Sequence, residues 1–369
     1  MKKIKFLFVM LLCLSLISLS SCDKTNHLLI SEVYESEGND RALELYNNSD
    51  RDISLSGYSI QIYKGLSKEY SYKINLKGKL GPKESYVISH PSAKEDTKHF
   101  ASLVTEDLSF NGSQAITLNK NKTIVDQIGV IGYSVKYYEN LTLVRKSNFL
   151  FPNPTFDEYE WIRYANGNRN YLGNATNSVT PEELLEGPRL TTEDYKKPFF
   201  ANEEKTLGGG GVVEVTVYSY VDGDTTMFNY PSELGIPNGT KVRYQNVNTR
   251  ESYTGHIQEW GIPAKNYTKE CLANAEKIEL QSVENGSIYE TFDRVLGWVW
   301  IDGVLQNYRL ALKGYTEDAF SSIDTIVYKD IPYTSYIYNA KLYAMRMKKG
   351  IWGEKDPYWD YEKNKSIYA

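Results

Sequence analysis

The chain has 369 residues and a net charge of -5 at pH 7. This length allows two domains after removal of an export signal. The negative charge excludes nucleic-acid binding through bulk electrostatics, so any such binding must use a local basic groove. Its three cysteines and four histidines show no metal-binding spacing, which excludes a Cys/His metal site.

The N-terminus has the pattern of a bacterial export signal. A basic n-region precedes an apolar run, residues 6–19, that is too short for a comfortable membrane span. Leu-Ser-Ser then stands directly before Cys22, which resembles a bacterial lipoprotein box. The resemblance implies that residues 1–21 are removed, that Cys22 carries the lipid, and that residues 22–27 tether the protein to the extracellular face of the cell membrane. The alternative is an ordinary signal peptide with an incidental cysteine.

With Cys13 inside the signal and Cys22 used for the lipid, only Cys271 remains in the folded part. We therefore expect no intramolecular disulfide there. Cys271 lies on a predicted helix beside Leu272 and Ala275, which favours a buried structural thiol over a nucleophile.

Residues 28–176 read as an all-β domain. Short alternating or apolar runs are separated by turns rich in Asn, Asp, Ser and Gly, which is typical of a sandwich. The clearest runs are residues 28–34, 42–46, 58–63 and 115–118.

Several motifs in this region resemble the bacterial lamin-tail domain. They are residues 30–33 (ISEV), 41–47 (RALELYN) and 52–58 (DISLSGY), with closing pieces at 143–146, 160–161 and 171–173. The resemblance implies an immunoglobulin-like sandwich that binds or tethers, with a ligand that the sequence does not reveal. Glu32 and Glu44 are expected on exposed strand faces, because acidic residues alternate there with apolar ones.

Residues 177–210 read as a linker. Thr180, Pro181 and Glu183 predict a short helix with a capped N-terminus. Four glycines at 208–211 predict a flexible joint, so we expect the two domains to move relative to each other. The glycine run lacks the Lys-Ser/Thr and the helix of a phosphate-binding P-loop.

Residues 211–355 are predicted to form the second domain and residues 356–369 a C-terminal tail. Expected strands lie at 212–219, 225–230, 240–247, 276–282 and 294–301, and expected helices at about 263–275, 304–313 and 335–349. Five strands with inserted helices match a small barrel of the oligonucleotide/oligosaccharide-binding (OB) type. The predicted fold class is therefore mostly β in two domains, an immunoglobulin-like β-sandwich followed by a five-stranded α+β OB-type barrel with three helices.

Three stretches of the second domain carry candidate chemistry. Asp222-Gly223-Asp224 follows an alternating run, a second stretch holds Arg243, Asn248, Thr249 and Glu251, and Arg294 heads an apolar strand. Oxygen ligands, guanidinium groups and a candidate general base suit metal-assisted hydrolysis of a phosphodiester. Each stretch alone is weak evidence for such a site, since Asp-Gly after an alternating run is usually a hairpin turn.

The order of these stretches resembles the staphylococcal nuclease (thermonuclease) family over roughly residues 211–353. The resemblance implies that calcium is held by Asp224, Asn248 and the backbone carbonyl of Thr249. It implies that Glu251 is the general base and that Arg243 and Arg294 grip the phosphate. Arginine suits this role because its planar fork binds two phosphate oxygens. Asp222 either shapes the turn or holds a water beside the metal.

The sequence departs from the family at some positions. Asn248 stands where the family has an aspartate, which removes a negative charge from the calcium site. Phe292 stands where the family has a tyrosine that touches the phosphate. Phe292 and Phe320 are weaker substrate-binding candidates, and Phe320 is equally well read as a base-stacking residue or a core aromatic.

The sequence therefore predicts a lipid-anchored, calcium-dependent endonuclease that hydrolyses DNA, or RNA, with little sequence preference. The alternative is a non-catalytic surface protein that binds nucleic acid or another ligand and has a degenerate nuclease domain, with its lamin-tail domain acting as the adhesive part. Nothing in the sequence indicates an oligomer.

Overall fold

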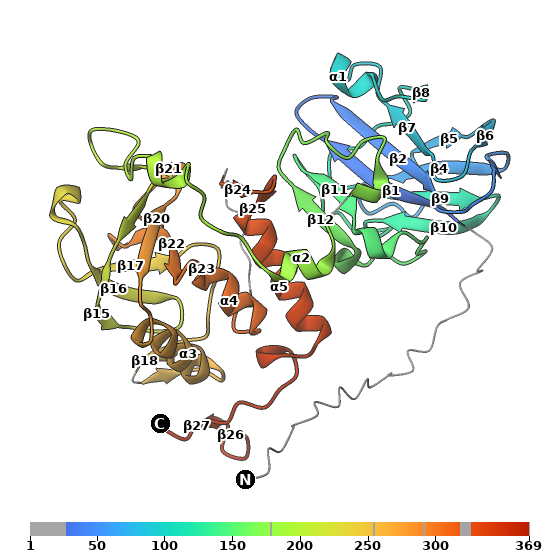
Figure 1. The fold of residues 1–369 in the computed structure, drawn as a ribbon. Coiled ribbons are helices and arrows are strands. Elements are labelled where there is room, and N and C mark those ends of the chain that lie inside the picture. The colour runs from blue at the N-terminus through green and yellow to red at the C-terminus, as the bar shows by residue number, and fades with distance from the viewer. Residues whose placement is uncertain (1–26, 178, 254, 291, 318–325, 369) are drawn as a thin grey trace, which may run out of the picture.

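The computed structural model describes residues 27–177, 179–253, 255–290, 292–317 and 326–368. Within these ranges the chain is mostly β and forms two lobes (Figure 1). Helix α5 (Tyr333–Arg346) lies between the lobes. The mostly β class predicted from the sequence is confirmed.

The N-terminal lobe is a sandwich of two sheets with an apolar core between them. The larger sheet has the order β12-β11-β1-β2-β7-β8, with β1 (Leu28–Glu35), β2 (Arg41–Asn47), β7 (Ser85–Ser89), β8 (Leu103–Val104), β11 (Thr142–Arg145) and β12 (Trp161–Tyr164). The smaller has the order β10-β9-β4-β5, with β4 (Tyr58–Tyr63), β5 (Tyr72–Asn75), β9 (Ala115–Lys120) and β10 (Thr123–Ile128). Two short strands, β3 (Ile53–Ser54) and β6 (Lys79–Leu80), pair with each other, and α1 (Glu95–Lys98) precedes β8. The four runs predicted from the sequence are strands β1, β2, β4 and β9.

The strand face that carries Glu32 and Glu44 is not exposed. Every residue of β1 and β2 is buried, and both glutamates have 0% of their surface exposed. One face of the larger sheet packs on the smaller sheet, while Leu172, from later in the chain, packs with Tyr34 and Ala42 on the other. The expectation of solvated acidic residues is therefore wrong, because it assumed a sheet with one face in water.

The segment between the lobes is ordered by contacts with the C-terminal lobe. Helix α2 (Pro181–Leu185) has the capping box predicted for Thr180 and Glu183. Strand β13 (Leu207–Gly209) pairs with β21 (Glu284–Ser287). A Cβ atom on Gly209 would lie 2.3 Å from the Pro198 carbonyl oxygen. The glycines are therefore needed for close backbone packing, and they do not form the flexible joint that their composition predicted.

The C-terminal lobe is built on one sheet of order β14-β20-β22-β17-β16-β15, with β23 beside β22. The strands are β14 (Val212–Glu214), β15 (Thr216–Tyr220), β16 (Thr225–Asn229), β17 (Thr240–Tyr244), β20 (Ile278–Ser282), β22 (Val295–Ile301) and β23 (Val304–Leu305). Only Val215 separates β14 from β15, and its N–H donates to the Ile278 carbonyl at 3.0 Å. The five predicted strands are present, but their pairing in the described ranges is an open path and not the closed barrel predicted from the sequence.

The three predicted helices are present within a few residues of their predicted bounds. They are α3 (Gly261–Ala273), α4 (Gln306–Leu312) and α5. Gly314 and Gly350, predicted as helix terminators, have φ angles of 77° and 53°. A Cβ on Gly314 would lie 2.4 Å from the Lys349 carbonyl oxygen, so the ends of α4 and α5 meet at these two glycines. Cys271, on α3, is a free cysteine of intermediate burial at the edge of the core.

The two lobes share a hydrophobic core. Val144 and Ile162 of the sandwich belong to the same buried cluster as Tyr336 and Ile337 of α5. At the rim of this contact, the Arg163 guanidinium lies 3.8 Å from the centre of the Tyr338 ring. This packing gives the lobes a common interior, which the linker composition did not indicate.

The C-terminal tail is ordered against the C-terminal lobe. Its hairpin joins β26 (Trp359–Asp360) to β27 (Lys365–Ser366), and Asp356 accepts a hydrogen bond from the Trp260 N–H at 2.6 Å. A second small hairpin, β24 (Val327–Tyr328) with β25 (Ile331–Pro332), leads into α5. Among the described residues, no helix combines the length and apolar character needed to cross a bilayer.

Candidate functional site

The loop after β15 lies against the end of β17. Thr225, the first residue of β16, pairs with Arg243 on β17. The Asp224 carbonyl accepts a hydrogen bond from the Tyr244 N–H at 2.8 Å. The strand register therefore places Asp224 beside Arg243.

Arg243 joins two of the predicted metal ligands. Its guanidinium forms an ion pair with the Asp224 carboxylate, and its Nη2 donates to Asn248 Oδ1 at 2.8 Å. The second carboxylate oxygen of Asp224 accepts a hydrogen bond from the Thr249 N–H at 2.6 Å. The structure thus brings Asp224, Arg243, Asn248 and Thr249 into one polar cluster.

A second carboxylate lies next to this cluster. Asp222 accepts a hydrogen bond from the Asp224 N–H at 3.2 Å. Burial raises the pKa of Asp222 well above its usual range, and the negative charge of Asp224 raises it further. Two carboxylates in a partly desolvated loop repel each other, and a cation beside them relieves that repulsion.

Gly223 lets the carboxylate loop approach helix α3. A Cβ atom on this glycine would lie 2.7 Å from Thr249 Oγ1 and 2.8 Å from the Ala264 Cβ. The Gly223 carbonyl accepts a hydrogen bond from the Thr268 hydroxyl at 2.6 Å. The helix therefore fixes the loop from behind and holds it against the Thr249 segment.

Glu251 follows the cluster and is fixed through its backbone. Its N–H donates to Gln258 Oε1, and its carbonyl accepts from the Gln258 N–H, both at 2.9 Å. In the described ranges of the chain, no hydrogen bond or ion pair engages the Glu251 carboxylate, which is half-buried. Among the described residues, no hydrogen bond or ion pair links that carboxylate to Arg243, Asp224 or Asn248.

Arg294 lies on the same face of the sheet as Arg243. Strands β17 and β22 are parallel, and Arg243 pairs with Leu296. Arg294 precedes Leu296 by two residues, and side chains two apart along a strand share a face. Its guanidinium forms an ion pair with Glu290, and the Arg294 side chain is 28% exposed.

The remaining predicted residues are placed as follows. Phe292 is 85% exposed with a φ angle of 75°, so its ring stands in solvent just before Arg294. Phe320 and Cys22 lie outside the described residues.

The cluster suits calcium in its ligand chemistry. Calcium takes carboxylate, amide and backbone carbonyl oxygens. Asp224 and Asn248 direct one oxygen each to the same guanidinium, so two of the three predicted ligands already converge on a positive group. Across the described residues, no group of three or more His, Cys, Asp or Glu side chains is placed to hold a metal.

Sequence reasoning missed the residues that support this cluster. Thr316 Oγ1 accepts a hydrogen bond from the Asn248 N–H at 2.9 Å, and Thr316 forms a β-bridge with Thr249. Neither Thr316 nor Gln258 belongs to a recognisable motif, so only the tertiary contacts identify them. The sequence did offer one indication of the Glu290–Arg294 ion pair, since Glu290 lies four residues before Arg294.

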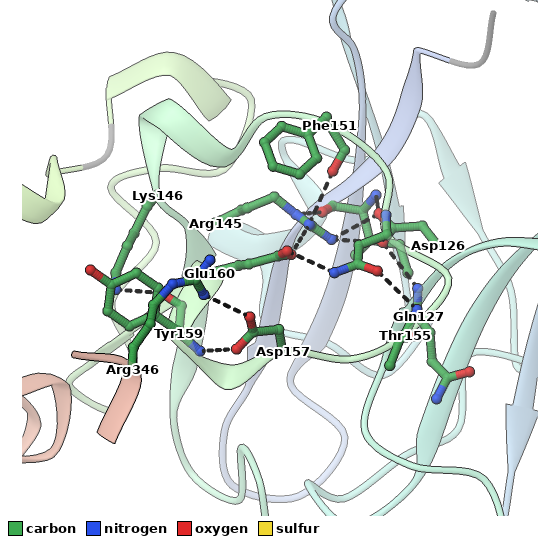
Figure 2. Close-up of polar contacts among 12 residues, drawn as sticks. Asp126, Gln127, Arg145, Lys146, Phe151, Thr155, Asp157, Tyr159, Glu160 and Arg346 are labelled. Carbon is green, nitrogen blue, oxygen red and sulfur yellow. Dashed lines mark hydrogen bonds and ion pairs between the residues drawn. The ribbon is translucent and has the colours of Figure 1, made fainter. Parts of the chain in front are cut away.

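A second polar cluster is buried in the N-terminal lobe (Figure 2). Arg145, with 0% of its side chain exposed, donates to both carboxylate oxygens of Asp126 at 2.8 Å and to Glu160 at 2.6 Å. Its guanidinium also lies 4.4 Å from the centre of the Trp161 ring. Burial raises the pKa of Glu160 to about 7 despite the attraction of Arg145. These contacts tie parts of the sandwich together, which indicates a structural role for the cluster.

The same region meets helix α5. Lys146 is 1% exposed, and its ammonium group donates to the Tyr159 carbonyl. Burial lowers the pKa of Lys146 to about 7. Arg346 of α5 lies 4.7 Å from the Tyr159 ring centre and pairs with Asp157 at 3.1 Å (Figure 2).

A comparison with protein-family models identifies the first part of the chain. Residues 23–132 match the model of the Lamin Tail Domain. The match includes β1 to β10, while β11 and β12 continue the same sheet beyond it. The residues around Arg145 and Glu160 thus complete the sandwich from outside the matched range. The N-terminal lobe of this protein contains an immunoglobulin-like lamin tail domain.

Proposed function

We propose that this protein is a calcium-dependent nuclease, anchored to the extracellular face of the membrane through lipid on Cys22. The observation that carries the proposal is the meeting of Asp224, Arg243 and Asn248 in one cluster, with Arg294 on the same sheet face. Oxygen ligands and two guanidinium groups on one face of a sheet are what a phosphodiesterase site requires.

The strand order supports an OB-type fold for the C-terminal lobe. The sheet runs β14-β20-β22-β17-β16-β15, with a parallel pair between β17 and β22. Let β14 and β15 count as one bent strand, and number the five strands in chain order, so that β16, β17, β20 and β22 are strands 2, 3, 4 and 5. The order across the sheet is then 1-2-3-5-4, with strand 1 pairing at both ends of the path. This is the connectivity of the small barrels that bind oligonucleotides and that the staphylococcal nuclease family uses.

The proposed mechanism uses the chain's own residues to hold the substrate and a water molecule. Arg243 and Arg294 bind the non-bridging oxygens of the phosphate and stabilise the charge that grows there during attack. Glu251, whose carboxylate is not engaged by other described residues, orients the attacking water and accepts its proton. Calcium held by Asp224, Asn248 and the Thr249 carbonyl would supply positive charge beside the phosphate. Arg243 must leave Asp224 and Asn248 to reach that phosphate.

A second candidate function is binding without catalysis. Asn248 contributes no charge, and Arg243 already neutralises Asp224. A site that keeps this ion pair would bind a ligand without activating water. The two candidates differ in whether calcium at millimolar concentration produces cleavage.

The first experiment incubates the full chain with single-stranded DNA, double-stranded DNA and RNA while calcium is titrated from chelated to millimolar. Glu251→Gln and Arg294→Ala serve as blanks. Calcium-dependent cleavage that is lost in both blanks supports the nuclease. No cleavage of any substrate at any calcium level contradicts it and favours the binding protein.

The membrane anchor is tested separately. We expect Cys22→Ala to release the protein into the medium, because the lipid on Cys22 is the proposed anchor and the variant cannot carry it. Retention of this variant in the membrane fraction contradicts the anchor. The lamin tail domain is proposed to act as a spacer or binding module, and its ligand is a separate question.

A further inference from the structure

A short hairpin directly after Glu251 carries two stacked aromatic rings. The hairpin joins β18 (Ser252–Tyr253) to β19 (His256–Ile257), and Tyr253 pairs with His256 across it. The two ring centres lie 5.4 Å apart and the ring planes differ by 29°. Tyr253 is 56% exposed, and His256 is also exposed, so the hydrophobic cores do not use these rings.

The hairpin directs Tyr253 to the same side as Glu251. Successive side chains of a strand point to opposite faces, and each pair of residues advances the chain by about 7 Å. Ser252 is buried between half-buried Glu251 and exposed Tyr253, as this alternation requires. The Tyr253 ring therefore follows the Glu251 carboxylate along one face.

The base of the hairpin is fixed to the rest of the lobe. Gln258 forms two hydrogen bonds with the Glu251 backbone. A Cβ on Gly261 would lie 2.0 Å from the Glu251 carbonyl oxygen, so the chain returns in close contact with Glu251. Asp356 of the tail accepts the Trp260 N–H, and Tyr361 donates to Glu259 at 2.6 Å. The tail thus holds the segment that positions the rings.

We propose that the Tyr253–His256 stack is a base-binding platform for the nucleotide next to the phosphate held by Arg243 and Arg294. This inference rests on the proposed function and adds a preference for substrate class. A ring stacks on the face of a base only if that base is free of its neighbours, so the site favours single-stranded or locally unpaired nucleic acid. Stacking needs only a ring face, which agrees with cleavage at many sequences.

The test compares three variants of the full chain in the presence of calcium. Tyr253→Ala removes the platform, and the KM for a single-stranded oligonucleotide should rise about tenfold with kcat little changed. Tyr253→Phe keeps the ring, so its KM should lie much closer to that of the unmodified protein. Tyr133→Ala is the matched control, because Tyr133 is 61% exposed on the other lobe.

Binding is measured separately from cleavage. Fluorescence anisotropy of a labelled single-stranded oligonucleotide is recorded in Glu251→Gln, alone and combined with Tyr253→Ala. The platform predicts an affinity loss of about tenfold in the double variant. It also predicts that an oligonucleotide whose bases are replaced by abasic sites binds both forms equally.

The outcomes separate the two proposals. Cleavage with an unchanged KM in Tyr253→Ala would overturn the platform and leave the nuclease standing. Binding that weakens in Tyr253→Ala, without cleavage by the unmodified protein, would support the platform and overturn the nuclease. Neither binding nor cleavage would overturn both.

Discussion

Glu32 on β1 lies directly opposite Glu44 on β2, and both carboxyl groups are buried. Glu44 accepts a hydrogen bond from the Ser31 hydroxyl at 2.6 Å and another from the Gly173 N–H. Neither oxygen of Glu32 has a hydrogen-bond partner among the described residues. Burial and then the charge of Glu44 raise the pKa of Glu32 well above its usual range, and burial raises the pKa of Glu44 to about 7. Proton binding to either carboxyl group therefore removes a repulsion between two like charges inside the fold.

This pair makes stability depend on pH. Because both folded pKa values exceed the usual glutamate pKa of 4.5, the folded state binds protons more tightly than the unfolded chain. For Glu44, the stabilisation that comes from tighter proton binding in the folded state is complete below pH 4.5 and is lost as the pH rises through about 7. For Glu44 alone it is worth about 3 kcal/mol.

Glu32→Gln should flatten that pH dependence, because the amide has a similar shape and does not ionise. The thermal unfolding midpoint, measured from pH 5 to pH 8.5, should fall less steeply than in the unmodified protein. Glu37→Gln, on an exposed residue of the same lobe, is the control. If the unfolding midpoint fell equally steeply with pH in all three proteins, ionisation of Glu32 would not reduce the stability of the fold. Some slope should remain in the variant, since burial also raises the pKa of Glu160.

Arg145→Met should destabilise the N-terminal lobe. The change leaves Asp126 and Glu160 buried without their cation, and breaking a buried ion pair costs about 3–5 kcal/mol. The free energy of unfolding from urea titration measures the loss. Arg51→Met, on an exposed residue, should change stability by less than about 0.5 kcal/mol. A similarly small effect at Arg145 would refute the assigned role.

Asn248→Asp should increase calcium affinity. The added carboxylate restores a negative charge at a position that already directs an oxygen to Arg243. The calcium midpoint for binding, measured by calorimetry, should fall about tenfold, which corresponds to 1.4 kcal/mol. Asn285→Asp adds the same charge at an exposed position of the same lobe and should leave the midpoint unchanged. Equal midpoints in both variants would mean that residue 248 is not a calcium ligand.

Gly223→Ala should disturb the cluster through packing alone. Its new methyl group would lie within 2.8 Å of Thr249 and Ala264, so the carboxylate loop must move away from α3. Such overpacking costs about 1–3 kcal/mol, and calcium binding should weaken together with stability. In Gly286→Ala the nearest atom is 3.7 Å away, so that variant should behave like the unmodified protein. Unaltered calcium binding in Gly223→Ala would remove Gly223 from the site.

Local features of the fold were predictable from the sequence. The alternating runs of β1, β2, β4 and β9 predicted strands, because their period of two depends only on neighbouring residues. The capping box of α2 was predictable for the same reason, since its two partners are three residues apart. Glycines 314 and 350 likewise indicated the ends of α4 and α5.

Features that depend on distant residues were not predictable. The burial of Glu32 requires cover from residues near 172, and the order of the glycine run requires backbone contacts with Pro198. Composition alone describes such segments as solvated or flexible, because it contains no information about what packs on them. The same limit applies to Arg145, whose two carboxylate partners come from other parts of the chain.

The candidate site divides in the same way. The sequence by itself determined which side chains are available: the carboxylates, arginines and amide between Asp222 and Arg294, and their order along the chain. The tertiary structure alone decided that Arg243 meets Asp224 and Asn248, that Arg294 shares their sheet face, and that Tyr253 is exposed after Glu251. The physical reason is that the sequence gives the type of each residue directly. The distances between side chains and their burial depend on strand register and on close packing between segments that are distant in the chain.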